Sequence, residues 1–377
     1  MPKEGFKGMN LSVSKMSLFS AINKVSKAVP SKSNLSNADC ILLDAAGDEL
    51  RLVANNLELA IECIIPATVL EEGKICLESK SFMEIIRKIT DDDIKISTDK
   101  NYGTTIKYGS NHMDLMGKET DTFNDIPKFD YKDHLDISEY SLKEVIRQTI
   151  FSTSENEANK TLSGELFEIK DGILRVVSLD GQRVSIRRIE LNDDSLNKKI
   201  IVPGRSLNEL FKILGGETEK NVTLHFTDNH LIVCFDNTTL VTRLIDGDFF
   251  NIDNVLTKDY ETKVTINKKE LYESVDRSTL FASDGDKRAI VLSMKDSVME
   301  LRMKSTKGSM EENIEIEKEG SDLKIGFNPK FLMDALHVID DERIRLYFVS
   351  PKSPCFIRDD ADSYTYMILP VNLGAEG

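Results

Sequence analysis

KICLESKSFMEIIRKI (74–89) returns along the chain as KIIVPGRSLNELFKIL (199–214) and LKIGFNPKFLMDAL (323–336). With a shift of 125 residues, Ile75, Ile200 and Ile325 superpose in a short alternating run. Each copy continues into a segment whose apolar residues recur every three or four positions, and this pattern predicts a strand, a turn and a helix. A repeat of this length indicates tandem domains.

Two further patterns recur at nearly the same spacing. One is helical: LSVSKMSLFSAINKV (11–25), LDISEYSLKEVIRQT (135–149) and VTINKKELYESVDRS (264–278). The other is strand-like: ELRLVANN (49–56), ILRVVSLD (173–180) and ELRMKSTK (300–307). Together they predict an α+β protein of three tandem similar domains, each an internally doubled unit of two helices packed on antiparallel sheets. The expected domains are 1–132, 133–261 and 262–377, with residues 1–8, ahead of a second methionine, as an extension or an alternative start.

The predicted helices are positively charged although the whole chain is acidic. The 377 residues include 64 acidic and 49 basic ones, a net charge of −15, which argues against a uniformly basic nucleic-acid binder. The six helical segments nevertheless hold 15 Lys and Arg against 7 Asp and Glu, so they carry +8 and the remainder −23. Lys80, Arg205 and Lys330 stand where each repeated helix begins, a position where a cation gains nothing from the helix dipole. These cations indicate either a solvated surface or a face turned toward phosphates.

Several classes of protein are disfavoured by what the sequence lacks. No apolar stretch approaches the roughly 18 residues of a membrane span, and the start lacks the apolar core of a signal peptide, so we expect a cytoplasmic protein. Five cysteines without a CxxC pair indicate neither disulfides nor zinc, and four of them lie in strand-like runs as small apolar residues: Cys40, Cys76, Cys234 and Cys355. We find no catalytic motif and predict no metal or cofactor; the acidic run 91–93 lies in an expected turn.

The chain resembles a known family at five segments: LFEIKDGILRVVSLDGQRVSI (166–186), IVPGRSLNEL (201–210), LIDGDFFN (244–251), IGFNPKFLMDAL (325–336) and SPCFIRDDADSYTYMILPV (353–371). They are similar to the bacterial DNA polymerase III beta subunit, the DNA sliding clamp. The resemblance implies a non-catalytic processivity factor with the DNA clamp fold. As a head-to-tail homodimeric ring it would encircle double-stranded DNA without sequence specificity, slide, and tether the replicative polymerase, the clamp loader and repair proteins through short linear motifs.

The resemblance also implies three groups of site residues. Cations facing DNA would be Lys24, Lys27, Lys32, Lys80, Lys198, Lys199 and Arg205. Amides at the helix N-termini are a second expected source of phosphate contacts. Ring closure would involve Met113, Leu115 and Phe281.

The third group forms a hydrophobic pocket for peptides between the second and third domains. Its predicted members are Leu162, Leu179, Gly181, Arg183, Val184, Phe250, Val255, Asn328, Phe331, Pro354, Met367, Ile368, Leu369, Pro370, Val371, Asn372 and Leu373. For Leu162, Val184, Val255 and Ile368 the alternative is ordinary core packing. Phe250 stands where many relatives have proline, and Asn254 where a basic residue is common, so the motif preference stays open.

Two other functions remain as alternatives. An unrecognised hydrolase or metal enzyme on a repeat scaffold is opposed by the missing catalytic spacing. A repeat scaffold without a DNA partner differs from a clamp in having no need for a closed dimer around a duplex.

Overall fold

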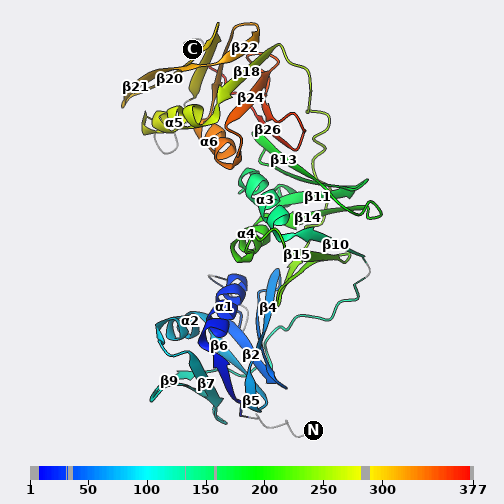
Figure 1. The fold of residues 1–377 in the computed structure, drawn as a ribbon, viewed down its shortest axis with the longest axis vertical. Helices are drawn as coiled ribbons and strands as arrows, with labels where there is room; N and C mark the ends of the chain where they lie inside the picture. The colour runs from blue at the N-terminus through cyan, green and yellow to red at the C-terminus, as the bar shows by residue number, and fades with distance from the viewer. Residues whose placement is uncertain are drawn as a thin grey trace. The chain divides into compact units, whose positions relative to one another are not determined.

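The chain folds as two compact units, residues 1–140 with 209–244 and residues 141–208 with 245–377 (Figure 1). The computed structural model describes residues 8–30, 32, 37–131, 133–156, 159–281 and 289–373. Most of the expected N-terminal extension (1–7) and the last residues (374–377) lie outside the described residues.

Six α-helices occur among the described residues. They are α1 (Lys15–Val25), α2 (Ser79–Lys88), α3 (Glu139–Thr149), α4 (Gly204–Ile213), α5 (Lys268–Ser278) and α6 (Pro329–Val338), with 3₁₀ turns η1 (Ser26–Ala28), η2 (Ile150–Ser152), η3 (Lys160–Ser163) and η4 (Thr279–Phe281). The helices α2, α4 and α6 each begin 125 residues after the one before. The repeat therefore predicted these helices correctly.

The first unit contains two sheets. In spatial order, the five-stranded sheet has β5 (Thr68–Glu71), β1 (Asn10–Ser14), β7 (Asp93–Thr98), β8 (Gly103–Tyr108) and β9 (Asn111–Met116). The eight-stranded sheet has β10 (Asp133–Ser138), β15 (Asn221–Phe226), β16 (His230–Phe235), β17 (Thr238–Arg243), β4 (Leu59–Pro66), β3 (Glu49–Asn55), β2 (Cys40–Ala46) and β6 (Gly73–Glu78).

The second unit also contains two sheets. The nine-stranded sheet has β14 (Lys198–Pro203), β11 (Gly164–Lys170), β12 (Ile173–Leu179), β13 (Arg183–Glu190), β26 (Tyr364–Ile368), β25 (Cys355–Arg358), β24 (Arg343–Phe348), β18 (Thr262–Asn267) and β22 (Glu317–Gly320). The four-stranded sheet has β21 (Gly308–Glu315), β20 (Val298–Ser305), β19 (Ile290–Lys295) and β23 (Leu323–Phe327).

The order of elements confirms the predicted doubling. A strand, a helix and three strands follow one another six times, with the short strands β5 and β22 added, and every strand pairing among the described residues is antiparallel. Two sheets run from one repeat into the next, because β17 pairs with β4 and β13 pairs with β26. The strands of the middle repeat are thus divided between the two compact units.

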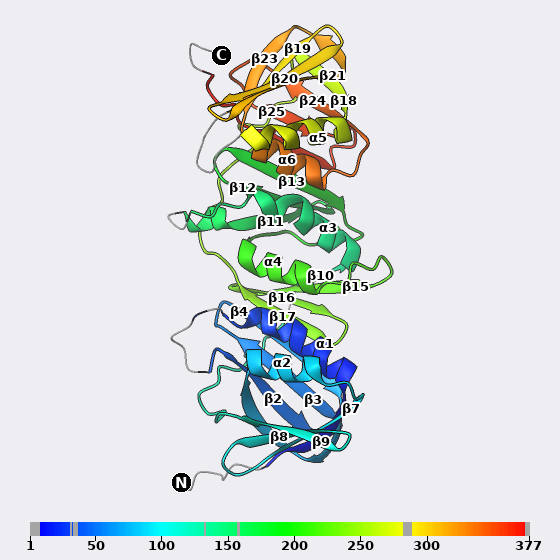
Figure 2. The same cartoon turned by 90° about the vertical axis from the view of Figure 1, so that its left-hand side faces the viewer.

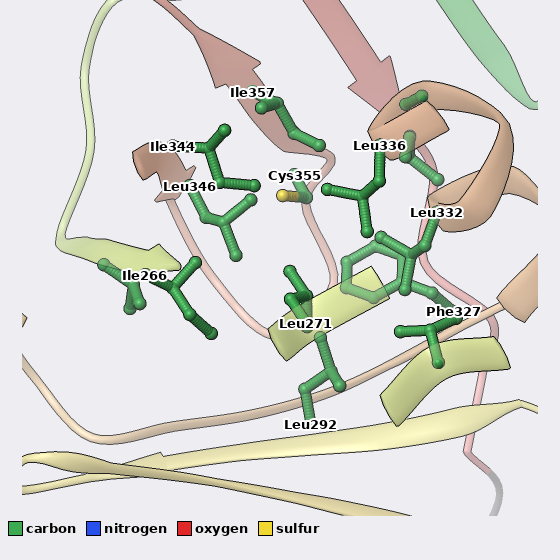
Figure 3. Packing of buried hydrophobic residues seen from close by; sticks show 14 of the residues in the cluster. Ile266, Leu271, Leu292, Phe327, Leu332, Leu336, Ile344, Leu346, Cys355 and Ile357 are labelled. Atoms are coloured by element: carbon green, nitrogen blue, oxygen red, sulfur yellow. The ribbon is translucent and has the colours of Figure 1, made fainter. Parts of the chain in front are cut away.

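Burial follows the repeat as well. The equivalent leucines Leu18, Leu142 and Leu271 are all buried on the sheet-facing sides of their helices. In the first unit α1 and α2 lie next to each other over the sheet (Figure 2). In the third repeat, Leu271 and Leu332 meet side chains from several strands in one apolar cluster (Figure 3).

The cysteines behave as predicted. All five are unpaired and lie in strands, and all but the half-buried Cys234 are buried. In the described part of the chain we find no helix with the length and apolar character needed to cross a membrane.

One carboxyl group is buried without compensation. Glu165, at the start of β11, is fully buried, and neither carboxylate oxygen has a hydrogen-bond partner among the described residues. Burial raises the pKa of Glu165 from 4.5 to about 8. The Thr149 hydroxyl offsets this shift only in part, because it donates its proton to the carbonyl of Val145 (2.7 Å).

The raised pKa predicts a stability that falls as pH rises. Between pH 4.5 and 8 the folded chain holds a proton that the unfolded chain releases, so this group's contribution is complete at low pH and is lost through that window. We expect Glu165→Gln to stabilise the fold by up to roughly 4 kcal/mol at pH 8 and by less than about 1 kcal/mol at pH 5. Urea unfolding at both pH values measures this, with Glu190→Gln at the exposed end of β13 as the control. Equal effects at both pH values would contradict the assignment.

Candidate functional site

Three exposed cations occupy the same place in three helices. Lys80, Arg205 and Lys330 are the second residues of α2, α4 and α6, and each side chain is exposed. None of the three makes an ion pair with another described residue. Their positive charge is therefore available to an external anion.

One later cation in each of α2 and α4 is neutralised instead. Arg87 pairs with Glu84 at 2.6 Å in α2, and Lys212 pairs with Glu209 at 2.8 Å in α4. Both pairs join residues three apart and occupy equivalent positions of the repeat. α2 and α4 thus leave the first-turn cation free and neutralise the cation that lies two turns later. Lys88, the last residue of α2, is exposed and makes no ion pair with a described residue.

Side-chain caps occupy some of the N-terminal amides at three helices. The Glu78 carboxylate accepts hydrogen bonds from the amides of Lys80 (3.1 Å) and Ser81 (2.6 Å) at the start of α2. The side chains of Asn267 and Asn328 cap α5 and α6 in the same manner. Because these amides already have acceptors, phosphate contacts at these helices depend on side chains.

The remaining predicted cations differ in availability. Lys32 is exposed and Lys27 is half-buried. Lys24 is instead engaged within the fold, since its Nζ donates to the Thr238 hydroxyl (3.0 Å) and lies 5.5 Å from the centre of the Phe235 ring. Lys24 is therefore less available to a phosphate than the exposed cations, and its contact with DNA stays a prediction.

The two cations on β14 are also partly committed. The exposed Lys199 lies 3.9 Å from the Glu168 carboxylate on the neighbouring strand β11. Lys198 is half-buried and makes a contact of its own. Both lie on a sheet edge and not on a helix, so they differ in setting from Lys80 and Arg205.

A cavity of about 390 Å³ lies in the second unit, where the β12–β13 turn, the start of α6 and the C-terminal segment meet. Its walls are Gly181, Gln182, Asn328, Phe331, Leu369, Pro370 and Val371. The amide of Leu369 donates to the Gln182 carbonyl (2.9 Å) and that of Val371 to the Gly326 carbonyl (2.8 Å). These bonds hold the C-terminal segment in place as one wall. No charged side chain of the described residues lines this cavity, which suits an apolar ligand group.

Arg183 supports this cavity and does not line it. Its guanidinium donates to Asp180 (2.9 Å), to Asp334 (2.5 Å) and to the carbonyl of Phe151 (2.6 Å), and it lies 4.5 Å from the centre of the Phe331 ring. These bonds use one hydrogen on each guanidinium nitrogen, and the side chain is buried, so little of it can reach a ligand. Arg183 was predicted to contact the ligand, but it does not line the cavity. Instead it holds Phe331 and α6 against the β12–β13 turn.

Other predicted members form the apolar base beside the cavity. Leu179, Val184 and Met367 are buried in one cluster, with the half-buried Leu162 packed against it. Ile368 is 1% exposed and belongs to the core of the third repeat, so here the alternative of core packing holds and the prediction of a pocket residue is wrong.

The outer members of the predicted list do not line the cavity. Phe250 and Val255 are 55% and 41% exposed on the segment that joins the second and third repeats. Pro354 is half-buried and Asn372 is exposed, while Leu373 lies over Gly326. The prediction missed Gln182, which lines the cavity. Its position directly after the Asp-Gly turn at 180–181 was the signal that could have indicated it.

The residues predicted to close the ring lie on or beside one edge strand in each compact unit. In the first unit this strand is β9, which carries the half-buried Met113 and Leu115 and the 69% exposed Met116. In the second unit it is β21, with Phe281 of η4 packed against Gly308 and Leu280 72% exposed beside it. Both edges offer unpaired backbone groups together with apolar side chains.

Comparison with known proteins gives consistent matches over the whole chain. Three family profiles match in sequence order: the N-terminal domain of the DNA polymerase III beta subunit at residues 9–128, its central domain at 136–251 and its C-terminal domain at 253–372. The Staphylococcus aureus beta sliding clamp is 31% identical over 374 residues, covering 96% of this chain and 99% of that protein.

The chain belongs to the DNA polymerase III beta subunit family.

Solved structures of this family share the fold. A Eubacterium rectale chain assigned to the DNA polymerase III beta subunit is 48% identical, with a TM-score of 0.94 over 97% of this chain and all of that one. The Bacillus subtilis DNA polymerase sliding clamp is 28% identical, with a TM-score of 0.93 over 97% of this chain and 99% of that one. The predicted family and clamp fold are thus confirmed.

This beta subunit is a processivity factor of DNA replication and not an enzyme. As a sliding clamp it works as a ring-shaped homodimer with DNA and polymerase as partners. The alternatives of an unrecognised hydrolase and of a scaffold without DNA are not favoured by any of these matches.

Proposed function

We propose that this clamp touches the DNA backbone mainly through Lys80, Arg205 and Lys330, with Lys27 and Lys32 as further contacts. The observation that carries this proposal is the free cation at the second residue of α2, α4 and α6. A few weak phosphate contacts hold DNA without fixing its register, which a sliding protein requires. The net charge of −15 then belongs mainly to surfaces that face away from DNA. The same proposal assigns the repeats to residues 1–132, 133–261 and 262–377 and the protein to the cytoplasm.

Reversing these charges tests the DNA contacts. We expect Lys80→Glu with Arg205→Glu to weaken binding to a short duplex by about tenfold or more at low salt. The slope of log K against log salt should fall by about one for each phosphate that the protein no longer neutralises. Fluorescence anisotropy over a salt series measures both quantities.

The control reverses an exposed cation on a strand end, Lys170→Glu in β11. Its single substitution changes the net charge as much as Lys80→Glu or Arg205→Glu does. If it weakens DNA binding as much per charge as the helix variants do, the effect is one of net charge, and the assignment of Lys80 and Arg205 is wrong.

We propose further that the cavity at the C-terminal segment receives short linear motifs of the replicative polymerase, the clamp loader and repair proteins. Phe331, Leu369 and Pro370 offer apolar walls to a ligand. A peptide with two apolar side chains can bury both there while its polar groups remain in water.

Removing one wall should weaken this binding selectively. Leu369 is 38% exposed, so Leu369→Ala removes apolar surface from the cavity with little effect on the core. We expect a synthetic peptide with adjacent Leu and Phe to bind about five- to twentyfold more weakly, because the peptide buries less apolar surface, by about 1–2 kcal/mol. Calorimetry measures the affinity, and Ile173→Ala, an aliphatic of similar exposure (41%), is the control. Undiminished binding to Leu369→Ala would refute the placement.

Ring closure is proposed to join β9 of one subunit to β21 of its partner. The two edge strands carry Met113 and Leu115 on one side and the neighbourhood of Phe281 on the other. A contact between two different surfaces of the same chain is head-to-tail, and it closes into a ring when the rotation returns to its start. The exposed Met116 and Leu280 extend this predicted interface beyond the residues that the sequence indicated.

A further inference from the structure

A second cavity lies in the first unit, outside the sites described above. It measures about 420 Å³ and is formed by the β3–β4 turn, the segment 123–129 and the strands β16 and β17. Its apolar lining includes Leu57, Phe123, Ile126, Phe129 and Val241. All of these elements belong to the same compact unit.

This cavity shares one part with the cavity at the C-terminal segment, namely the turn between two repeated strands. A shift of 124 residues places Leu57 on Gly181 and Glu58 on Gln182, so the two turns are equivalent. Both turns lie between strands of the same repeated pattern, β3 to β4 and β12 to β13. The same turn therefore lines a cavity in two repeats, with the segment 123–129 as the further wall in the first unit.

The strand pairing at the two cavities agrees as well. Ala60 on β4 lies opposite Val241 on β17, just as Val184 on β13 lies opposite Met367 on β26. In both places a strand of one repeat pairs with the last strand of the next repeat. The agreement in pairing is independent of the agreement in sequence, and it gives the second cavity a defined floor.

The turn at the mouth of the second cavity is strained. Leu57 has a φ of +74°, a left-handed conformation that costs a bulky residue roughly 1–2 kcal/mol. The equivalent Gly181, with φ +88°, adopts this conformation without that cost. Leu57 is nevertheless 52% exposed, so it does not repay the strain by core packing. Strain of this kind gathers at functional sites, and here it holds a leucine at the mouth of an apolar cavity.

The charge at the mouth is negative. Two carboxylates, Glu58 and Asp125, line the cavity, and no Lys or Arg of the described residues does. Asp125 is already paired with Arg51 at 2.6 Å; although burial opposes ionisation, the bonds from Arg51 keep the pKa of Asp125 below its usual value. Glu58 is exposed and makes no ion pair with a described residue, so its charge is available to a ligand.

The remaining polar wall is neutral. His230 lies with its ring centre 5.3 Å from that of Phe129. Burial, and then the charge of Arg243, lower the pKa of His230 and so favour the neutral ring. The uncompensated charge lining this cavity is therefore that of Glu58.

We propose that this cavity is a second groove for short peptides, which selects an apolar side chain next to a lysine or arginine. The apolar anchor would enter between Leu57 and the segment 123–129, while the cation pairs with Glu58 at the mouth. The uncharged first groove has no such preference. A clamp with both grooves can hold two partners with different motifs on one subunit.

The experiment uses the full chain carrying Leu369→Ala, which weakens the first groove. The probes are two fluorescent heptapeptides: Gly-Lys-Leu-Gly-Phe-Lys-Gly and its counterpart with both lysines replaced by glutamate. We expect saturable binding of the lysine peptide and at least tenfold weaker binding of the glutamate peptide. With Glu58→Lys added, the preference should reverse.

Leu57→Gly separates binding from stability. It removes the leucine and the backbone strain together, so we expect an unchanged or higher Tm with at least threefold weaker binding of the lysine peptide. The proposal is overturned if the lysine peptide shows no saturable binding, or if neither Glu58→Lys nor Leu57→Gly alters its affinity. Because DNA retention depends on other residues, these outcomes are independent of the clamp function itself.

Discussion

A dimer of this protein assembled on a nicked plasmid should remain bound at least ten times longer than on the same plasmid after linearisation. A closed ring holds circular DNA by topology, so it needs no tight contact, whereas a linear end lets it slide off. Gel filtration of the complex, with samples taken over time before and after cutting, measures the retention. Equal retention on both forms would contradict encirclement.

The edge strands supply a matched pair of variants for this experiment. Leu280→Glu with Met116→Glu places charges on the two exposed apolar side chains beside β21 and on β9, and should shift the protein to monomer and abolish retention on circles. Leu70→Glu alters an equally exposed leucine (70%) on β5, the opposite edge of the sheet that contains β9, and should leave the dimer intact. A monomeric Leu70→Glu protein would place the interface elsewhere.

Arg183→Met should cost about 2–4 kcal/mol of unfolding free energy and weaken binding of the Leu-Phe peptide tenfold or more. The substitution leaves the carboxylates of Asp180 and Asp334 without their buried partner, and the partial exposure of both reduces the cost below that of a fully buried pair. It also removes the cation that lies over Phe331, so the ring and α6 lose their fixed position.

Urea unfolding and calorimetry measure the two effects of Arg183→Met. Arg302→Met is the control, because Arg302 also pairs with two carboxylates, Glu300 and Glu311, but is 52% exposed; we expect less than about 1 kcal/mol. An Arg183→Met protein that binds the peptide with unchanged affinity would show that Phe331 is held by its other neighbours.

The positions of helices and strands were predictable because they depend on local pattern. The spacing of Leu18, Leu142 and Leu271 predicted three helices that all bury those leucines. The pairing of β4 with β17 was not predictable, since it joins strands far apart in the sequence and any exposed edge could have served. The division of the middle repeat between two units follows from that pairing.

The site shows the same limit. Phe331 and Leu369 were indicated by family resemblance and do line a cavity. Arg183 donates to two distant partners, Asp334 and the carbonyl of Phe151, and Lys24 donates to Thr238 on β17. Such tertiary contacts are not revealed by any local pattern. The cap at α2 was also hard to predict, because Glu78 is not one of the residues that usually cap a helix N-terminus.

Because two sheets continue from one repeat into the next, a single repeat is not expected to be stable when it is produced alone. A fragment ending near residue 132 would lose β17, and the stretch Leu59–Cys63 of β4 would present its backbone groups to solvent along a largely apolar strand. Such an edge is a template for aggregation. The first and middle repeats are therefore expected to tolerate separation only when both pieces are produced together, so that the missing strand is restored from the second fragment.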